Sequence, residues 1–490
     1  MLGSTLLSIG VLVGPSGAQV DAQPEGRWSQ FQGGPDHAGN ALDGPPPGYA
    51  EIWSLDAPLG GPGDRSGLSA PVIAGGLVVS VGPDEVIAVE ASSGVERWRI
   101  DRREGPPIQP AVSGEGPDAV VVFPEGYGPN PPTGDASTVT STTPSPSAGG
   151  DGGDDATSGV ELVAVALADG TEVWRTPLES PSRSGVTAAG DAVYVGANDG
   201  TVTALDAASG SIRWSEPAGG EVLRPVAVVD DLVVATSLGD LDAVLAVIAL
   251  RDDDGSEAWR YEPPVPVTLG SAPAVGAGSV IVGLADRTVR AIDLATGAPR
   301  WSARLNAEVS LFAAPAIAED DVIALDVAGQ VYRLDGATGE RIWDHALNAA
   351  VLWSSPVITG SHVLVATNRG ELFALELGTG DLVWQADLAD GLVRTLAVTS
   401  DLLVAVRSGS APGLVGLEHD PEAPLTRIVT PTAFDPGAQA RSFAMAAIPL
   451  IAIALVLGRV LSRRLGPAEL GAERAIDPIE DALGDPGNTR

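Results

Sequence analysis

The chain has 490 residues, no cysteine and a formal net charge of −36, and all 28 of its basic residues are arginine. The absence of cysteine excludes disulfide bonds, thiolate metal sites, a cysteine nucleophile and a lipid-modified cysteine. Acidity on this scale repels nucleic-acid phosphates, so we expect no nucleic-acid partner. Hydrophobic residues make up 44% of the sequence, which is ample for a large buried core.

The chain begins with an apolar segment from Leu2 to Val13, and small residues follow at Ala18 and Ala22. This pattern predicts a secretory signal peptide over residues 1–22, although the basic residues that usually open such a signal are missing. Next comes a segment rich in turn-forming residues, from Arg27 to His37, which leads towards the first repeated unit.

A short phrase recurs seven times, and in each copy a tryptophan follows a glycine by four residues. An apolar alternating run leads into the phrase, the glycine suits the positive φ of a tight turn, and the next strand then presents the tryptophan. A large ring at one fixed position of every repeat is more typical of packing between repeats than of ligand stacking. We therefore predict a structural docking motif, with no catalytic residue and no cofactor-binding residue. Its members are Gly94 and Trp98, Gly170 and Trp174, Gly210 and Trp214, Gly255 and Trp259, Gly297 and Trp301, Gly339 and Trp343, and Gly380 and Trp384.

The repeats have a period of roughly 42 residues, which is the spacing of four-stranded propeller blades. A proline recurs near the start of the first strand, a position that sheets tolerate. These prolines are Pro71, Pro110, Pro225, Pro273, Pro315 and Pro356.

The two ends of the repeat region are incomplete in complementary ways. After Trp384 the sequence offers only three further strands, with no glycine-to-tryptophan phrase behind them. Near the beginning, Glu51 to Leu55 reads as one isolated strand, and its Trp53 precedes Trp98 by 45 residues. Pairing these parts would give an eighth, composite blade and would remove the two exposed sheet edges. The predicted fold class is therefore all-β, an eight-bladed β-propeller with four-stranded blades over residues 23–420.

One repeat carries an insertion over residues 127–159 that is rich in Pro, Thr, Ser, Gly and Asp. Such a composition cannot bury a core, so we expect a disordered loop, and it would also suit O-glycosylation. Its Asp151, Asp154 and Asp155 lack a loop pattern that would wrap calcium. The four histidines of the chain are scattered, so we predict no metal site.

The C-terminal part departs from the repeats. A polar linker, residues 421–441, leads to the uncharged apolar run of residues 442–458. Because Arg459 can snorkel towards the membrane surface, this run predicts a transmembrane helix over residues 442–461. Arg459, Arg463 and Arg464 flank its far side, against Arg441 on the near side, which places the tail of residues 462–490 in the cytoplasm. The expected location is the cell membrane, as a single-pass protein with its propeller outside the cytoplasm.

The repeated phrase Asp-x-x-Thr-Gly-x-x-x-Trp, as at Asp293 to Trp301 and Asp335 to Trp343, resembles the tryptophan-docking motif of pyrroloquinoline-quinone-type β-propellers. The resemblance covers roughly Trp28 to Leu417, and Trp28 to His37 is similar to a leading segment common in that family. One branch of the family comprises alcohol dehydrogenases with a quinone and a calcium ion on the propeller axis. Another comprises non-catalytic propellers, including the scaffold lipoprotein of the outer-membrane β-barrel assembly machinery.

The resemblance to the enzyme branch implies a vicinal cysteine pair and calcium-binding residues, which we do not find in this sequence. The scaffold lipoprotein uses a cysteine for its lipid, and here the C-terminal helix takes that anchoring role. We therefore expect no enzyme and no cofactor. The expected function is a membrane-anchored extracytoplasmic scaffold for other membrane or cell-envelope proteins. The alternatives are an extracytoplasmic sensor or small-ligand-binding propeller and, behind it, a quinone-dependent dehydrogenase.

Overall fold

The computed structural model describes residues 27–56, 67–103, 105–126, 159–238, 245–267, 270–305, 311–352, 354–388, 391–409 and 412–423. The predicted signal peptide, almost all of the insertion, most of the linker, the predicted transmembrane helix and the tail lie outside these residues. Within them, no helix has the length and apolar character needed to cross a membrane.

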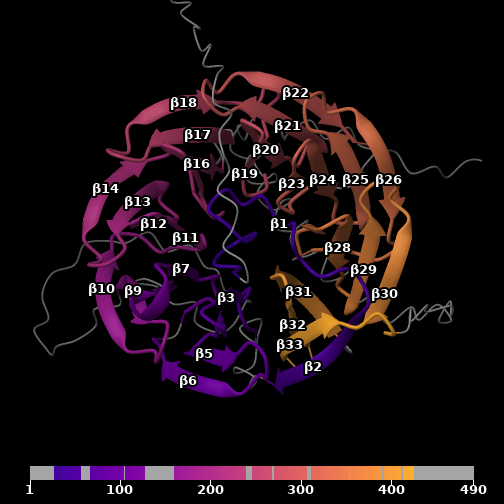
Figure 1. Cartoon of the computed structure of the whole chain (residues 1–490). Coiled ribbons are helices and arrows are strands. Elements are labelled where there is room, and N and C mark those ends of the chain that lie inside the picture. The colour runs from indigo at the N-terminus through magenta and orange to yellow at the C-terminus, as the bar shows by residue number, and fades with distance from the viewer. Residues whose placement is uncertain are drawn as a thin grey trace, which may run out of the picture. The chain divides into compact units, whose positions relative to one another are not determined.

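The described strands form eight sheets arranged as a ring of blades, with the first strand of each blade nearest the centre (Figure 1). The first four blades are β3 (Val72–Ala74), β4 (Leu77–Val81), β5 (Glu85–Glu90) and β6 (Glu96–Asp101); β7 (Ala111–Ser113), β8 (Val120–Glu125), β9 (Val160–Ala166) and β10 (Glu172–Leu178), with the 3₁₀ turn η1 (Gly116–Asp118) after β7; β11 (Val186–Ala189), β12 (Ala192–Gly196), β13 (Thr201–Asp206) and β14 (Ile212–Pro217); and β15 (Ala227–Val229), β16 (Leu232–Ser237), β17 (Ala246–Arg251) and β18 (Glu257–Tyr261).

The next three blades continue this order, and the eighth is composite. They are β19 (Ala274–Gly276), β20 (Ser279–Gly283), β21 (Thr288–Asp293) and β22 (Pro299–Arg304); β23 (Ala316–Ala318), β24 (Asp321–Leu325), β25 (Gln330–Asp335) and β26 (Arg341–Ala346); β27 (Val357–Thr359), β28 (His362–Ala366), β29 (Glu371–Glu376) and β30 (Leu382–Asp387), with the short β1 (Asn40–Ala41) beside β27; and β31 (Gly391–Val398), β32 (Leu403–Gly409), β33 (Gly413–His419) and β2 (Tyr49–Asp56).

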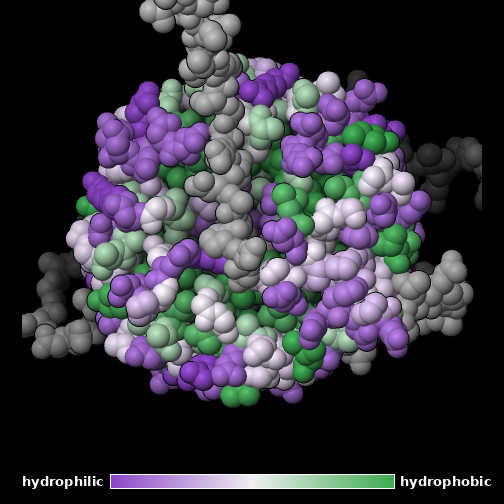
Figure 2. Space-filling view, viewed as in Figure 1, coloured by the Kyte–Doolittle hydropathy of each residue, from purple (hydrophilic) through white to green (hydrophobic). Residues whose placement is uncertain are grey.

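The burial of the strands follows their place in the blade. Middle strands are apolar and buried on both faces, as in β16, because each blade is covered by a neighbour on either side. Outer strands such as β14 expose most positions but bury the tryptophan. The core therefore lies between blades, with each apolar cluster drawing on adjacent sheets. Hydrophilic side chains cover much of the face seen in Figure 2, with hydrophobic residues in scattered groups.

The eighth blade confirms the expected composite closure. β2, from the N-terminal side, pairs antiparallel with β33, from Tyr49 opposite His419 to Asp56 opposite Gly413. The ring thus closes within one sheet, and β2 and β33 are not left as unpaired edges at the point of closure. The all-β, eight-bladed fold with four-stranded blades is as the sequence predicts.

Candidate functional site

The seven glycines of the repeated phrase lie in the turns between the third and fourth strands of blades one to seven. Their φ angles fall between +68° and +76°, in the left-handed region that favours glycine. A Cβ at any of them would also come within 2.9 Å of an indole ring. Backbone conformation and space therefore both require glycine at these positions.

The indole that faces each glycine belongs to the preceding blade, so each phrase contacts the next phrase and not itself. In all seven, the indole Nε1–H donates to a backbone carbonyl of the facing turn at 2.7–2.9 Å. The pairs are Trp53 with Gly94, Trp98 with Gly170, Trp174 with Gly210, Trp214 with Gly255, Trp259 with Gly297, Trp301 with Gly339, and Trp343 with Gly380.

The structure shows two features of these contacts that the predicted docking motif does not include. Trp53 begins the series although no phrase precedes it, and its 45-residue spacing from Trp98 was the available signal. The strand ladder also shifts register immediately before each tryptophan, as between Ala291 and Ile292 of the fifth blade. Trp301 itself pairs with Ala291, whose small side chain lies beside the ring in the sheet. Such a bulge re-aims the side chain that follows it.

The acidic residue that opens the phrase shapes the turn. Oδ1 of Asp293 accepts hydrogen bonds from the backbone N–H and the hydroxyl of Thr296, at 3.0 and 2.7 Å, and Oδ2 accepts from Arg300. In the third blade, Asp206 makes the equivalent contacts, and its hydrogen bond from Arg213 is the main reason why the pKa of its carboxyl falls to about 2. These carboxylates are engaged within the turns.

Trp384, the last tryptophan of the motif, has a different environment at the closing blade. No turn exists there for it to meet, because β33 and β2 are two separate parts of the chain. Its ring is buried and meets Tyr49 edge-on, with ring centres 5.2 Å apart. Within the described residues its Nε1–H has no acceptor. We call this region, residues 48–56 together with 413–420, the seam.

The N-terminal residues 28–39 run through the centre of the ring, where Figure 1 shows the indigo trace. We call them the axial segment. They hydrogen bond with the innermost strand of seven blades in turn, mostly through backbone groups. The bonds join Trp28 with Ile73, Ser29 with Val112, the Gln30 side chain with Ala188, Pro35 with Val228, Asp36 with Val275, Ala38 with Ile317, and Gly39 with Ile358.

This segment provides partners for the free edge of each innermost strand, which would otherwise expose its N–H and C=O groups to the channel. The path requires unusual backbone, since Gln32 and His37 both have φ of +55°. Trp28 is only 2% exposed and lies against the first blade. The segment that resembled a family leader is thus an integral part of the ring centre.

Two ionisable residues of the axial segment are buried. Burial raises the pKa of the Asp36 carboxyl to about 6, while its Oδ1 accepts a hydrogen bond from the Ala38 N–H at 3.3 Å. Burial lowers the pKa of the neighbouring His37 to about 3. The His37 ring nitrogens lie 3.3 Å from the Pro273 carbonyl and 3.3 Å from the Thr187 hydroxyl. At neutral pH these values describe a neutral imidazole beside a carboxylate that burial disfavours.

No group of three or more His, Asp or Glu side chains in the described ranges is arranged to hold a metal ion. Asp151, Asp154 and Asp155 of the insertion lie outside those ranges. Several of the carboxylates that the structure does describe pair with arginines or accept hydrogen bonds from turn N–H groups, as at Asp191 and Asp335.

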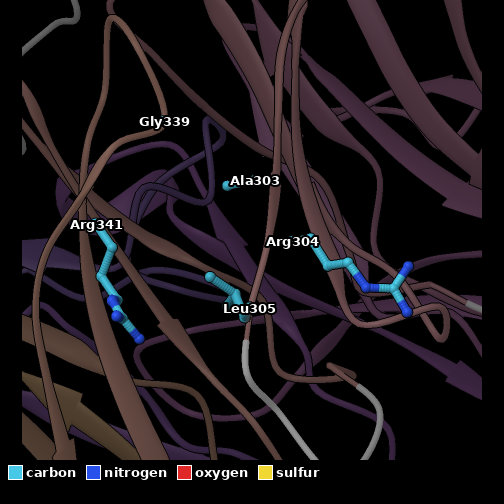
Figure 3. A pocket seen from close by; sticks show the side chains of 5 residues that line it. All are labelled: Ala303, Arg304, Leu305, Gly339 and Arg341. Atoms are coloured by element: carbon cyan, nitrogen blue, oxygen red, sulfur yellow. The ribbon is translucent and has the colours of Figure 1, made fainter.

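A cavity of about 330 Å³ lies between the fifth and sixth blades. Ala303, Arg304 and Leu305 come from the end of β22, and Gly339 and Arg341 come from the facing turn and the start of β26. In Figure 3 Ala303 and Leu305 face Arg341, whereas the Arg304 side chain extends from the opposite side of the strand, away from Arg341. Sequence reasoning did not find this cavity, because its two sides belong to different repeats.

Comparisons with known proteins agree with this architecture. The sequence profile of the family described as outer membrane protein assembly factor BamB, built on PQQ-type repeats, matches residues 158–331 and 327–420. The chain is 34% identical over 152 residues to the outer membrane protein assembly factor BamB of Shewanella oneidensis, which covers 27% of this chain and 37% of that protein. It is 33% identical over 161 residues to the protein of the same name from Yersinia pestis, which covers 30% and 39%.

The chain therefore matches less than two fifths of the length of these two relatives. Among solved structures, the quinohemoprotein alcohol dehydrogenase ADHIIG of Pseudomonas putida HK5 superimposes with a TM-score of 0.58 at 12% identity, over 86% of this chain and 85% of that one. At that identity the likeness concerns the fold alone. The profile match spans more than half of the 490 residues, and the chain thus belongs to the PQQ-like β-propeller family described as outer membrane protein assembly factor BamB.

Proposed function

We propose that this protein is a non-catalytic scaffold of the cell envelope, which holds other envelope proteins on the surface of a rigid propeller. The observation that carries the proposal is the axial segment. It fills the centre of the ring and hydrogen bonds with seven innermost strands, so the ring interior at that level is occupied by the protein's own chain. What the molecule offers to other molecules is then its loops, its rim and the grooves between blades.

The family supports this reading. The relatives that the chain matches are named as outer membrane protein assembly factors, and we extend to this chain the general role of assembling with envelope proteins. The seven docking contacts also suit a scaffold, since they hold neighbouring blades in fixed register and preserve the geometry of an extended binding surface. We propose the docking role for the seven glycines of the repeated phrase and for each tryptophan that faces one of them. Trp384 faces no turn and packs against Tyr49 instead.

The proposal includes a place in the cell. Residues 1–22 would direct export, residues 442–461 would anchor the chain in the membrane, and residues 462–490 would face the cytoplasm. The support comes from the sequence: the apolar start, the uncharged span and the arginines that follow it. A tag fused after Arg490 should survive protease added to cells with permeable outer layers, whereas the propeller should be degraded. Digestion of the tag with a protected propeller would contradict both assignments.

Crosslinking in living cells followed by purification from detergent-solubilised membranes tests the scaffold role. The full chain and a chain ending at residue 441 should recover the same envelope proteins, because the propeller would hold them and the anchor would only locate it. An unrelated exported propeller with the same tag serves as the control. If no envelope protein is recovered above the level of that control, the scaffold proposal is wrong.

A dye-reduction assay separates the scaffold from the dehydrogenase alternative. The purified protein, supplied with pyrroloquinoline quinone and calcium, should give no alcohol-dependent dye reduction above a heat-denatured sample. Turnover that saturates with alcohol would favour the enzyme. A small-ligand sensor would instead show stabilisation by a ligand in a thermal-shift screen, with no envelope proteins recovered.

A further inference from the structure

Arg224 is a cation that the fold buries without giving it a partner. It precedes Pro225, shortly before the innermost strand β15 of the fourth blade. Its Nε is buried and has no acceptor, and within the described residues its guanidinium forms no hydrogen bond and no ion pair. Burial lowers the pKa of this guanidinium, and no neighbouring carboxylate offsets the effect. The residues before the corresponding prolines of other blades are uncharged: Ala70, Gln109, Ala272, Ala314 and Ser355.

A lone buried guanidinium is strongly unfavourable. Its desolvation is not repaid by an opposite charge, and arginine does not lose its proton to escape the penalty. Buried arginines in proteins are therefore found beside acids or bound anions. This chain has 64 acidic residues against 28 basic ones, so acidic side chains are plentiful, yet none of those described pairs with Arg224. The other blades show that the repeat does not need a charge at this position.

The alternation of the chain places the Arg224 side chain between the third and fourth blades. On either side of it, Val222 and Val226 pack in the apolar cluster shared with the third blade. Leu223 and Ala227 pack in the cluster shared with the fifth blade. Because side chains of an extended segment alternate between its two faces, Arg224 belongs with Val222 and Val226. The guanidinium therefore faces the third blade, at the end of the interface where β15 begins.

Asn198 is a second polar residue without a partner at this end of the same interface. It follows strand β12 of the third blade, and its Oδ1 is buried without a donor in the described residues. The segment of residues 181–184 contacts both residues: the Pro181 carbonyl accepts from the Asn198 N–H at 2.9 Å, and the Ser184 hydroxyl donates to the Arg224 carbonyl at 2.9 Å. A side-chain amide can present either its oxygen or its NH₂ group, so Asn198 can also act as a donor here.

The seventh blade shows what this asparagine does when the fold satisfies it. Asn368 occupies the corresponding position, and its backbone N–H donates to the Ala350 carbonyl at 2.9 Å as that of Asn198 does to Pro181. Its Oδ1, however, accepts a hydrogen bond from the Leu352 N–H at 3.1 Å. The third and fourth blades thus leave open two groups, an arginine and an asparagine, that the repeat elsewhere omits or satisfies.

We propose that Arg224 binds a small oxyanion, a carboxylate or a phosphate, between the third and fourth blades, with the Asn198 amide as a second donor. The planar guanidinium matches both groups through charge-assisted hydrogen bonds. Arg224 as a whole is half-buried, so an ion can reach it from solvent, and the surrounding protein strengthens the interaction by excluding water. This binding site goes beyond the scaffold role and does not depend on it.

The test compares sodium chloride, sodium phosphate and sodium acetate at equal ionic strength and pH 7, with the full-length protein in detergent. The melting temperature of the wild type should rise and saturate with phosphate or with acetate, and the salt that acts identifies the anion. Equilibrium dialysis with labelled phosphate or acetate should then give one site per chain. Arg224→Met, which keeps the length of the side chain without its charge, should lose at least tenfold in affinity.

The sign of the stability change separates an anion site from a structural arginine. In chloride, Arg224→Met should melt at a higher temperature than the wild type, because it removes a buried charge that nothing compensates. In saturating phosphate or acetate this difference should shrink or reverse, since only the wild type gains from the anion. An Arg224→Met variant that melts lower than the wild type in every salt would contradict the proposal.

The controls use matched residues of the same chain. Arg251→Met removes an arginine of the fourth blade that is 51% exposed and should bind the anion within about twofold of the wild type. Asn198→Ala should weaken binding, whereas Asn368→Ala should not. Wild-type protein that binds neither anion in a saturable way, or equal losses in Arg224→Met and Arg251→Met, would overturn the proposal. Dialysis involves no other protein, so this proposal and the scaffold role can fail separately.

Discussion

The seven turn-docked blade interfaces and the seam solve the same packing problem by different means. At each of the seven, an indole N–H donates to a turn carbonyl and the ring covers a glycine of the next blade. At the seam, Trp384 has no turn to meet and packs against Tyr49 instead. The axial segment also distinguishes the eighth blade from the other seven. It hydrogen bonds with the innermost strands of blades one to seven, and among the described residues none of its hydrogen bonds reaches the eighth blade.

The difference shows which docking contacts a repeated hairpin provides and which of them the closing blade lacks. A continuous hairpin turn provides both a free carbonyl and a glycine, whereas two separate chain segments provide neither. The eighth blade is held instead by the ladder between β2 and β33, which extends from Tyr49 to Asp56. Stability there depends on backbone pairing between distant parts of the chain, and elsewhere it depends on contacts repeated along the sequence.

The strongest test of this comparison removes the pairing at the seam. Deleting residues 48–55 takes away most of β2 together with Trp53, which docks on Gly94. We expect an opened ring that loses cooperative unfolding and aggregates. The reason is that β33 loses the strand that pairs with it, and the turn at Gly94 loses the indole ring that covers it. Size-exclusion chromatography and thermal unfolding measure this. A deletion of equal length at residues 424–431, in the predicted linker, is the control, and a monomeric seam deletion that melts like that control would refute the closure.

The docked turns can be broken one at a time. Gly297→Val would place a branched side chain at φ +70° and within 2.8 Å of the Trp259 ring. We expect a loss of more than about 3 kcal/mol in the free energy of unfolding, from backbone strain and overpacking together. Gly378→Val is the matched control, since that turn glycine has open space around it and should cost less than about 1 kcal/mol. Urea midpoints of the two variants decide the matter, and equal losses would contradict the docking role.

The axial segment is probed by pH. The pKa of Asp36 is raised by burial to about 6, so its protonated form is favoured in the folded state and its stabilising contribution is lost as pH rises from about 4 through 6. His37, with its pKa lowered to about 3, acts oppositely, since its neutral form is favoured and stability is lost as pH falls below about 6.5. The two trends partly cancel in the wild type.

Asp36→Asn separates them, because asparagine can still accept the Ala38 hydrogen bond but does not titrate. The free energy of unfolding of this variant, relative to the wild type, should rise by about 2 kcal/mol between pH 4 and pH 7. Urea unfolding at several pH values measures this difference in the free energy of unfolding. The control is Asp43→Asn, a substitution of a solvent-exposed carboxyl that lies shortly after the axial segment. A difference that does not change with pH would show that Asp36 is hydrated in the folded protein.

The smallest effect gives the sharpest comparison of the two regions. Trp259→Phe removes the donor to the Leu294 carbonyl, whereas Trp384→Phe removes an N–H that has no acceptor in the described residues. Both substitutions lose similar ring area, so we expect Trp259→Phe to cost about 1–2 kcal/mol more than Trp384→Phe. Equal urea midpoints for the two variants would mean that the indole hydrogen bonds contribute nothing to blade docking.

Sequence reasoning succeeded where the pattern was periodic. The spacing of Gly297 and Trp301, repeated in seven phrases, predicted the blades, and the isolated Trp53 predicted the composite closure. It failed where a contact joins two repeats. The phrase gave no indication that Trp259 would face Gly297 of the next blade, or that Leu305 and Arg341 would line one cavity. Such contacts depend on the angle between neighbouring blades, which no single repeat encodes.

By itself, then, the sequence determined the number of blades, their strand order, the glycine turns and the absence of any cysteine chemistry. These follow from local hydrophobic alternation and turn preference, which are properties of a few adjacent residues. Only the tertiary structure decided the partner of each tryptophan, the path of residues 28–39 through the ring centre and the position of the cavity between the fifth and sixth blades. The axial segment in particular has no periodicity, and its partners are mostly backbone N–H and C=O groups, which are the same in every residue and leave no mark in a sequence.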